Sequence, residues 1–276
     1  MKIIGIGDNV IDYYIHQGLM YPGGNALNVA VLGKRNGAEK AAFLGMFGND
    51  KPSEHIVSCL QEEKIDITRC RYVIGECGEA IISLKNGDRV FIGSNKRTRV
   101  DSLLRLNLQE DDIEFIEEFD VIHTSINSNV DTELEKISYK EISYDFSDRR
   151  KWNKNIIAKI APYITYAFFS GSDLNEDEIF KLIDFVQLFD VPVVGVTRGS
   201  KSAIFSIHGE IFQQEPHPTK LIDTMGAGDS FIAGFLTSYC KNRNPIRSLQ
   251  KAAASAAITC SHFGSIGYPK KRQKNI

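Results

Sequence analysis

The sequence DTMGAGDSFIAGFL, residues 223–236, is the most informative segment of the chain. Two glycines and an alanine precede Asp229, and an apolar run typical of a buried helix starts directly after it. Glycines let a backbone approach a ligand closely, and the first turn of a helix presents unpaired N–H groups at the positive end of its dipole. The stretch therefore predicts an anion site that is suited to a phosphate.

A carboxylate beside a phosphate site needs an explanation because two anions repel each other. Asp229 fits if it accepts the proton of a hydroxyl that attacks the phosphate, while the N–H groups of Gly226, Ala227 and Gly228 stabilise the developing charge. The simpler alternative is a helix-capping aspartate after a tight glycine turn. Other phosphate motifs fit poorly, because the chain has no GxxxxGK[ST] loop and Gly5-Ile6-Gly7 lacks the third glycine of a dinucleotide fingerprint.

The composition is that of an ordinary globular protein. A chain of 276 residues predicts one large α/β domain, with or without a small appendage. The net charge of −2 indicates neither nucleic acid nor a membrane surface as a partner, and no apolar run approaches the roughly 20 residues of a membrane helix. Five cysteines without a CxxC pair favour reduced thiols and a cytoplasmic location. The basic tail, 270–274, is expected to be a solvated terminus.

Strand patterns alternate with helical patterns along most of the chain. This order predicts a mostly parallel sheet with helices on both faces. Strands are expected at 2–9, 41–50, 120–126, 141–147, 166–172, 191–199 and 202–212, and helices at 25–37, 52–64, 175–189 and 245–262. Two β-rich segments, 69–74 and 79–93, with a turn at Asn86-Gly87, are expected to join the arm at 13–22 in a small separate sheet.

Ligands of such folds bind at the carboxyl ends of the strands. The predicted ends form a polar rim, although each of its members alone is usually a capping or turn residue. The rim consists of Asp8, Asn9, Asp12, Asn49, Asp50, Asp145, Asp148, Ser170, Asp173, Thr197 and Arg198.

Two long motifs at opposite ends of the chain resemble the signatures of the PfkB family of carbohydrate kinases, which includes ribokinase. DTMGAGDSF resembles the C-terminal signature, and GGNALNVA at 23–30 resembles the N-terminal GGxxxNxA. FLGMFGND at 43–50 is similar to the next block of the family. Three shorter segments, GDN, DRVF and YDFSD, resemble the members that phosphorylate the 6-hydroxyl of fructoselysine.

The resemblance implies a ribokinase-like α/β fold in one domain, 1–276, with a β-lid formed by about 13–22 and 71–95. It implies ATP as the phosphoryl donor, Mg²⁺ as its metal and a small sugar or sugar-amine as the substrate. Asp229 corresponds to the catalytic base, and Gly226, Ala227 and Gly228 correspond to the anion hole. The implied sugar ligands are Asp8, Asp12, Gly24, Asn25 and Asn28, and the implied nucleotide-binding residues are Ser170, Thr197 and Gly199.

The metal-binding motif departs from the family pattern. Where the family has Asn-x-x-Glu, this chain has Ser170 and Asp173 in register, which makes Asp173 the candidate for Mg²⁺. A later Asn-x-x-Glu at 175–178 is expected to be an acidic helix start. The family also implies a monovalent cation such as K⁺ near the anion hole, with Asp223 as its candidate ligand and a turn carboxylate as the alternative.

Several alternatives stay open. Asn25 has the N-cap of the helix as a second candidate role, which is compatible with sugar binding. Arg89 is either a surface ion-pair partner or the ligand of the carboxylate in fructoselysine. A kinase for another ketose or a nucleoside, a non-catalytic sugar- or nucleotide-binding regulator, and a dinucleotide-dependent enzyme are the rival functions. An exposed lid edge is expected to allow a homodimer.

Overall fold

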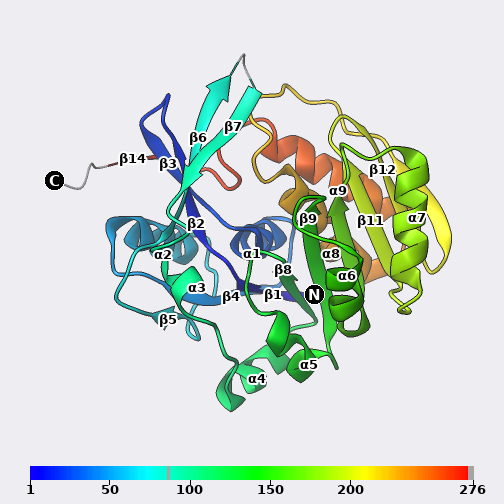
Figure 1. Cartoon of the computed structure of the whole chain (residues 1–276), viewed down its shortest axis with the longest axis horizontal. Helices are drawn as coiled ribbons and strands as arrows, with labels where there is room; N and C mark the ends of the chain where they lie inside the picture. Colours follow the sequence, from blue (N-terminus) through cyan, green and yellow to red (C-terminus); the bar gives the residue numbers. More distant parts are fainter. Residues whose placement is uncertain (86–87, 273–276) are drawn as a thin grey trace.

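The computed structural model describes residues 1–85 and 88–272, and the side chains of 84, 85, 88 and 89 also lie outside the description. The predicted Asn86-Gly87 turn and the predicted role of the Arg89 side chain therefore fall outside the described residues. Within them, the strands form one sheet of nine strands and a second sheet of five (Figure 1).

The large sheet has the strand order β13-β12-β11-β10-β9-β8-β1-β4-β5. Its strands are β1 (Lys2–Gly7), β4 (Lys40–Phe47), β5 (Arg71–Tyr72), β8 (Val121–Ser125), β9 (Glu141–Asp148), β10 (Tyr166–Ser170), β11 (Val193–Arg198), β12 (Lys201–Ile207) and β13 (Glu210–Gln214). Neighbours from β5 to β11 are parallel, and β12 and β13 add antiparallel pairs. The mostly parallel sheet is confirmed. The single strand expected at 202–212 is wrong, because a turn with positive φ at His208 and Gly209 divides it.

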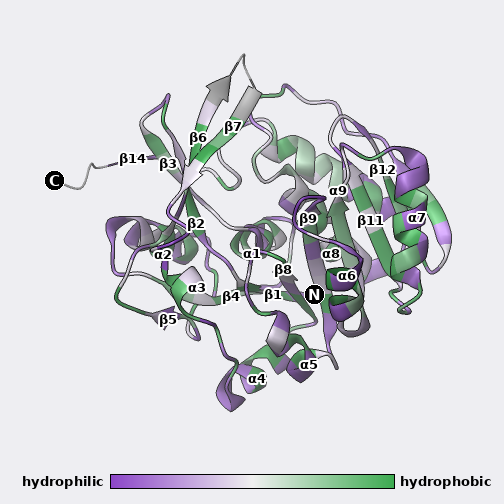
Figure 2. Cartoon of the chain, in the orientation of Figure 1, coloured by the Kyte–Doolittle hydropathy of each residue, from purple (hydrophilic) through white to green (hydrophobic). Residues whose placement is uncertain are grey.

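Helices cover both faces of this sheet, so successive strand residues are buried on opposite sides. Ile3 belongs to the core cluster with the helices at 25–35, 51–62, 227–242 and 245–259, whereas Ile4 belongs to the cluster with the helices at 110–117, 134–137, 154–160 and 176–187. Strand β11 is accordingly hydrophobic, and the helix at 176–187 that covers it carries hydrophilic residues (Figure 2). The helices are α1 (Asn25–Arg35), α2 (Lys51–Glu62), α3 (Val100–Leu103), α4 (Glu110–Glu117), α5 (Leu134–Ile137), α6 (Lys154–Ile160), α7 (Glu176–Gln187), α8 (Ala227–Asn242) and α9 (Pro245–Thr259), with 3-10 turns at Asp131–Glu133 and Ala161–Tyr163.

The second sheet has the order β14-β3-β2-β6-β7. Its strands are β2 (Val10–Tyr14), β3 (Leu19–Gly23), β6 (Gly78–Lys85), β7 (Asp88–Ser94) and β14 (Lys270–Lys271). Arg71–Tyr72 lies outside it, because β5 pairs with β4 of the large sheet. The solvated tail expected at 270–274 is wrong for its first residues, since β14 pairs with β3 and Arg272 donates to Glu79 at 2.7 Å.

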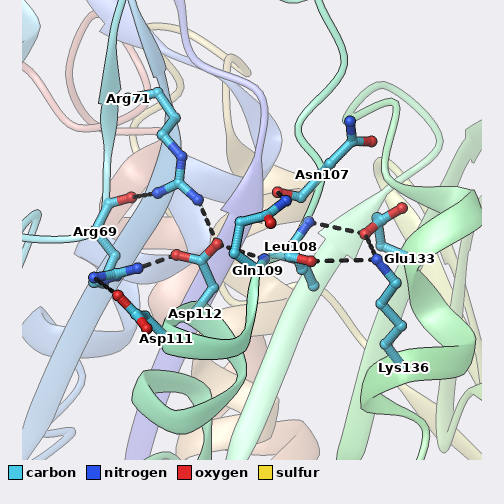
Figure 3. A network of polar contacts seen from close by, with 9 residues as sticks. All are labelled: Arg69, Arg71, Asn107, Leu108, Gln109, Asp111, Asp112, Glu133 and Lys136. Carbon is cyan, nitrogen blue, oxygen red and sulfur yellow. Dashed lines mark hydrogen bonds and ion pairs between the residues drawn. The ribbon is translucent and has the colours of Figure 1, made fainter.

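A polar network holds the segment that leads from the second sheet to α4 (Figure 3). The buried Asp112 carboxylate accepts hydrogen bonds from Arg71, from Arg69 at 3.1 Å and from the Gln109 N–H at 2.9 Å. Burial raises the pKa of Asp112, but the hydrogen bonds, led by that from Arg71, outweigh it and lower the pKa below its usual value. Glu133 accepts from the Leu108 N–H at 2.8 Å. The network therefore joins β5, the start of α4 and the Asp131–Glu133 turn.

None of the helices in the described residues is long and apolar enough to cross a membrane.

Helix α1 lies directly on β1 because Gly5 has no side chain. A Cβ at Gly5 would lie 2.1 Å from the Ala26 carbonyl oxygen. We expect Gly5→Ala to lower the free energy of unfolding by about 2–3 kcal/mol, because the backbone of α1 would have to move away from the sheet. Urea unfolding measures this change.

Gly93→Ala is the matched control, because a Cβ there meets only Ile81 at 3.5 Å on the exposed strand β7. Equal stabilities for the two variants would contradict the close packing of α1 on β1.

Candidate active site

The candidate site is a cavity of about 360 Å³ at the carboxyl ends of the parallel strands. Helices α1 and α8 begin at this edge, so their N-terminal N–H groups meet the strand ends. A cavity of this size suits a small polar ligand. Its lining residues are Asp8, Val10, Asp12, Gly24, Asn25, Asn28, Arg99, Asn127, Asp145, Ser147, Ser170, Met225, Gly226, Gly228 and Asp229.

The start of α8 combines a glycine turn with free helix N–H groups. Gly226 is the N-cap with φ 71°, and a Cβ there would lie 2.3 Å from the Ser265 Cβ. Glycine is therefore required for both conformation and space. The Ala227 N–H donates to the Thr224 carbonyl at 3.3 Å, whereas the Gly228 and Asp229 N–H groups lie in the first turn, where the helix supplies no acceptor.

Two amides from α1 hold the Asp229 carboxylate. Asn25 donates to Oδ1 at 2.7 Å and Asn28 donates to Oδ2 at 2.6 Å. Asn25 and Asn28 are three residues apart, so one face of α1 presents both, as the sequence predicts. The Oδ1 atom of Asn28 is buried and has no hydrogen-bond partner among the described residues, which leaves it as an acceptor for a donor in the cavity.

The pKa of Asp229 is raised to about 7. Loss of bulk water is the largest cause, and the negative charges of Asp145 and Asp8 add to it, whereas the hydrogen bonds from Asn28 and Asn25 lower the pKa. A carboxylate with a pKa near neutrality is basic enough to accept a proton, and about half of it is ionised at pH 7. The arrangement therefore suits a general base.

A second carboxylate shares the Asn25 amide. Asn25 Nδ2 also donates to Asp145 Oδ2 at 2.8 Å, and burial raises the pKa of Asp145 to about 6. Asn25 Oδ1 lies 2.8 Å from His123 Nε2. Asn25 thus connects β8, β9 and α8.

Asp8 has a structural role in the site. Its carboxylate accepts from the Asn25 N–H at 2.8 Å, the Ala26 N–H at 3.3 Å and the Ser128 hydroxyl at 2.7 Å. The expectation that Asn25 caps α1 is wrong, since Gly24 is the N-cap residue and Asp8 satisfies the first N–H groups from outside the helix. The role of Asp8 as a sugar ligand stays a prediction.

The structure places most of the predicted site residues around one cavity. Asp8, Asp12, Gly24, Asn25, Asn28, Ser170, Gly226, Gly228 and Asp229 all line it. Thr197 and Gly199 lie beside it, because Thr197 pairs with Ser170 across β10 and β11 and Gly199 follows at the turn into β12. A Cβ at Gly199 would meet nothing within 4 Å, so the space above this turn is open. The strand ends thus extend the site toward an exposed surface, where the nucleotide is expected.

The donor set for Mg²⁺ is sparse. Asp173 is exposed on the loop after β10, and the described residues assemble no group of three or more potential metal ligands. This fits Mg²⁺, which is usually held by one or two carboxylates together with waters and substrate phosphates. The later Asn175 caps α7 and exchanges hydrogen bonds with Glu178, which confirms the expected acidic helix start.

Asp223 does not lie in the cavity lining. Its buried carboxylate accepts from the Tyr14 hydroxyl, from the Met225 N–H at 3.1 Å and from the Gly264 N–H at 3.1 Å. Three donors therefore hold this carboxylate between the second sheet and the loop before α8. These contacts match the turn-carboxylate alternative.

Three residues that line the cavity or contact Asn25 were not among the expected site residues. Asp145 is one of many acids in the predicted polar rim, and no motif in the sequence singles out His123. Arg99 lines the cavity and forms an ion pair with Asp101 at 2.7 Å. Its only sequence signal is its position just after the β-rich segment.

Comparison with known proteins agrees with this geometry. The model of the pfkB family carbohydrate kinases matches residues 4–271. The chain belongs to this family. Its activity is therefore ATP-dependent phosphoryl transfer to a sugar.

Named relatives cover nearly the whole kinase. It is 43% identical over 270 residues to fructosamine kinase FrlD of Bacillus subtilis, covering 97% of this chain and 94% of that protein. It is 29% identical to fructoselysine 6-kinase of Escherichia coli, over 94% of this chain and 97% of that protein. The crystal structure of a fructokinase with bound ATP from Xylella fastidiosa superposes with a TM-score of 0.80 at 17% identity, over 96% of this chain and 94% of that one. The ribokinase-like fold is thereby confirmed.

We expect Asp229→Asn to lower kcat by about 10³-fold, since the variant keeps the size of the side chain but cannot accept the proton. The affinity for ATP should change little. Turnover measures the first effect and nucleotide titration the second, with the melting temperature as a control for folding. Near-normal turnover would contradict the role of Asp229 as base.

The activity of the unmodified kinase should depend on the ionisation of Asp229. With a pKa of about 7, kcat/KM should fall about tenfold per pH unit below pH 7 and level off above it, because the protonated carboxyl cannot act as a base. Initial rates between pH 5.5 and 9 check this, with the coupling enzymes in excess at every pH. A flat profile across this range would rule out such a base.

Proposed function

We propose that this kinase transfers the γ-phosphoryl group of ATP to the 6-hydroxyl of a fructosamine, with fructoselysine as its substrate. The observation that carries the proposal is the Asp229 carboxylate, held by two amides beside the first N–H groups of α8 in a small cavity. Two extensively similar relatives are named for fructosamine and fructoselysine.

The charge of the cavity supports an amine-bearing sugar. Its described acidic lining residues are Asp8, Asp12, Asp145 and Asp229, against one described cation, Arg99. The secondary amine of a fructosamine is protonated at neutral pH, so this surplus of carboxylates favours it over an uncharged ketose.

Different residues of the site have different roles in the proposed phosphoryl transfer. Asp229 takes the proton of the 6-hydroxyl, while Asn25 and Asn28 aim its oxygens at the cavity. Gly226, Ala227 and Gly228 form the proposed anion hole. The Gly228 N–H, in the first turn of α8, would stabilise the charge that develops on the phosphoryl oxygens, whereas the Ala227 N–H would first have to release the Thr224 carbonyl. ATP with Mg²⁺, the donor that fits this family, supplies the phosphoryl group, whose bond to the sugar oxygen forms as its bond to ADP breaks. The second sheet, as a lid, would exclude water and prevent hydrolysis.

A homodimer through the second sheet remains part of the proposal. Strand β7 is at the edge of this sheet, and its Phe91 and Ile92 side chains are exposed. Exposed strand edges are surfaces on which a second copy can pair.

A coupled ADP-release assay tests the function. The panel contains fructoselysine, other fructose–amino acid adducts, fructose, ribose and adenosine, with ATP and Mg²⁺ and with K⁺ present or omitted. Selective turnover of fructoselysine is the expected result. Turnover of only a plain sugar or a nucleoside would overturn the substrate, and ATP binding without any turnover would favour a regulator.

Arg99 is the described residue best placed to bind the carboxylate of the amino acid, because a guanidinium matches a carboxylate in charge and geometry. We expect Arg99→Gln to raise KM for fructoselysine about tenfold, but not KM for an adduct of fructose with butylamine, which has no carboxylate. Steady-state kinetics with both substrates give the comparison.

Arg97→Gln is the matched control, because Arg97 is an exposed neighbour outside the cavity lining. An equal rise of KM for both adducts, or no rise with Arg99→Gln, would rule out carboxylate recognition by Arg99.

A further inference from the structure

A chain of buried hydrogen bonds leads from the interior of the large sheet to Asp229. Ser143 Oγ lies 2.9 Å from His123 Nδ1, and His123 Nε2 lies 2.8 Å from Asn25 Oδ1. Asn25 Nδ2 then reaches Asp229 at 2.7 Å. His123 and Ser143 are opposite each other in neighbouring strands β8 and β9, and both are fully buried.

The carboxylates of Asp145 and Asp229, at one end of this series of hydrogen bonds, determine which atom donates and which accepts in each of the others. Ionised carboxylates only accept hydrogen bonds, so Asn25 must present its amino group to Asp145 and Asp229. Its carbonyl oxygen then faces His123, which must donate from Nε2. A neutral imidazole has only one N–H, so Nδ1 must accept from the Ser143 hydroxyl.

His123 does not take up or release a proton near neutral pH. Burial lowers its pKa to about 3, so the imidazole stays neutral in the working range. Its function in the chain must therefore be geometric, through the tautomer that it holds.

Asn25 is the critical point of the network because it faces two carboxylates at once. If its amide rotated by half a turn, its oxygen would face both of them and the hydrogen bonds would become repulsions. The charged groups that face Asp229 are Asp145 from β9 and Asp8 from the end of β1, and Asp12 of β2 and Arg99 line the same cavity. Neutral Asn25 and Asn28 are the donors that face it from α1.

We propose that His123 and Ser143 are positioning residues that lock the Asn25 amide, so that Asp229 is held ionised and aimed at the substrate hydroxyl. The inference rests on the proposed role of Asp229 as the base. Neither residue touches the cavity, so both act only through Asn25.

The test is the pH profile of His123→Leu, which removes both ring nitrogens at similar volume. Without a donor at its oxygen, the Asn25 amide is free to rotate, and Asp229 loses a hydrogen bond that favours its ionised form. We expect the acid limb, the pH range in which kcat/KM falls as the pH decreases, to move up by about one pH unit. The value of kcat/KM should then be about tenfold below that of the unmodified kinase at pH 6.5 and equal to it by pH 9. The KM for ATP should stay unchanged.

Two further variants test the same hydrogen bonds if His123→Leu fails to fold. Ser143→Ala frees the imidazole to take the other tautomer and should shift the limb in the same direction by less. His123→Gln retains an N–H donor and should restore most of the activity at pH 6.5. Thr124→Val is the matched control, because Thr124 is equally buried on β8 but donates to the Ile6 carbonyl at 2.8 Å, away from Asn25. It should lower the melting temperature without moving the limb.

The possible outcomes separate the inference from the proposed function. A uniform loss at every pH in the His123 variants, or a limb in the same place as in the unmodified kinase, would make His123 a packing residue and overturn the inference alone. An unmodified kinase with no acid limb, or with no turnover of any fructosamine, would overturn the proposed function and the inference with it.

Discussion

The site depends on the hydrogen bonds that join the Asp229 carboxylate to two amides of α1. Asn25 and Asn28 are about 200 residues away from Asp229 in the chain, so these bonds form only when α1 and α8 pack side by side on one face of the large sheet. A carboxylate with little bulk water around it would otherwise take up a proton and lose its use as a base. Its ionisation is therefore a property of the tertiary fold.

The packing of α1 on β1 also provides an acceptor for the first N–H groups of the helix. Gly5 lets the helix lie close to β1, and Asp8, at the end of the same strand, accepts from the first N–H groups of the helix. A strand and the helix that covers it are thus joined at the edge where ligands of parallel sheets bind. The acids at this edge make different contacts. Asp8 accepts hydrogen bonds from the start of α1, whereas Asp229 faces the cavity.

Neighbouring carboxylates raise the pKa of Asp229, and the hydrogen bonds from Asn25 and Asn28 oppose this rise. Asp145 and Asp8 both raise the pKa of Asp229, and one amide, that of Asn25, donates to both Asp145 and Asp229. The neutral His123 behind Asn25 adds no charge, so it can fix the amide without changing the field in the cavity. The cavity is rich in carboxylates, and Arg99 is the one cation among its described lining residues.

Short contiguous motifs were enough to predict the family, the mostly parallel sheet and the glycine turn before α8, because each depends on residues that are close together in the chain. The shared helix face of Asn25 and Asn28 follows from helix geometry alone. Local patterns did not reveal that Asp8 accepts from the first N–H groups of α1, that 270–271 completes the second sheet, that Arg99 lines the cavity, or that Asn25 joins His123 to Asp145 and Asp229. Each of these is a contact between segments that are distant in the chain, and no local pattern of side chains specifies such a partner.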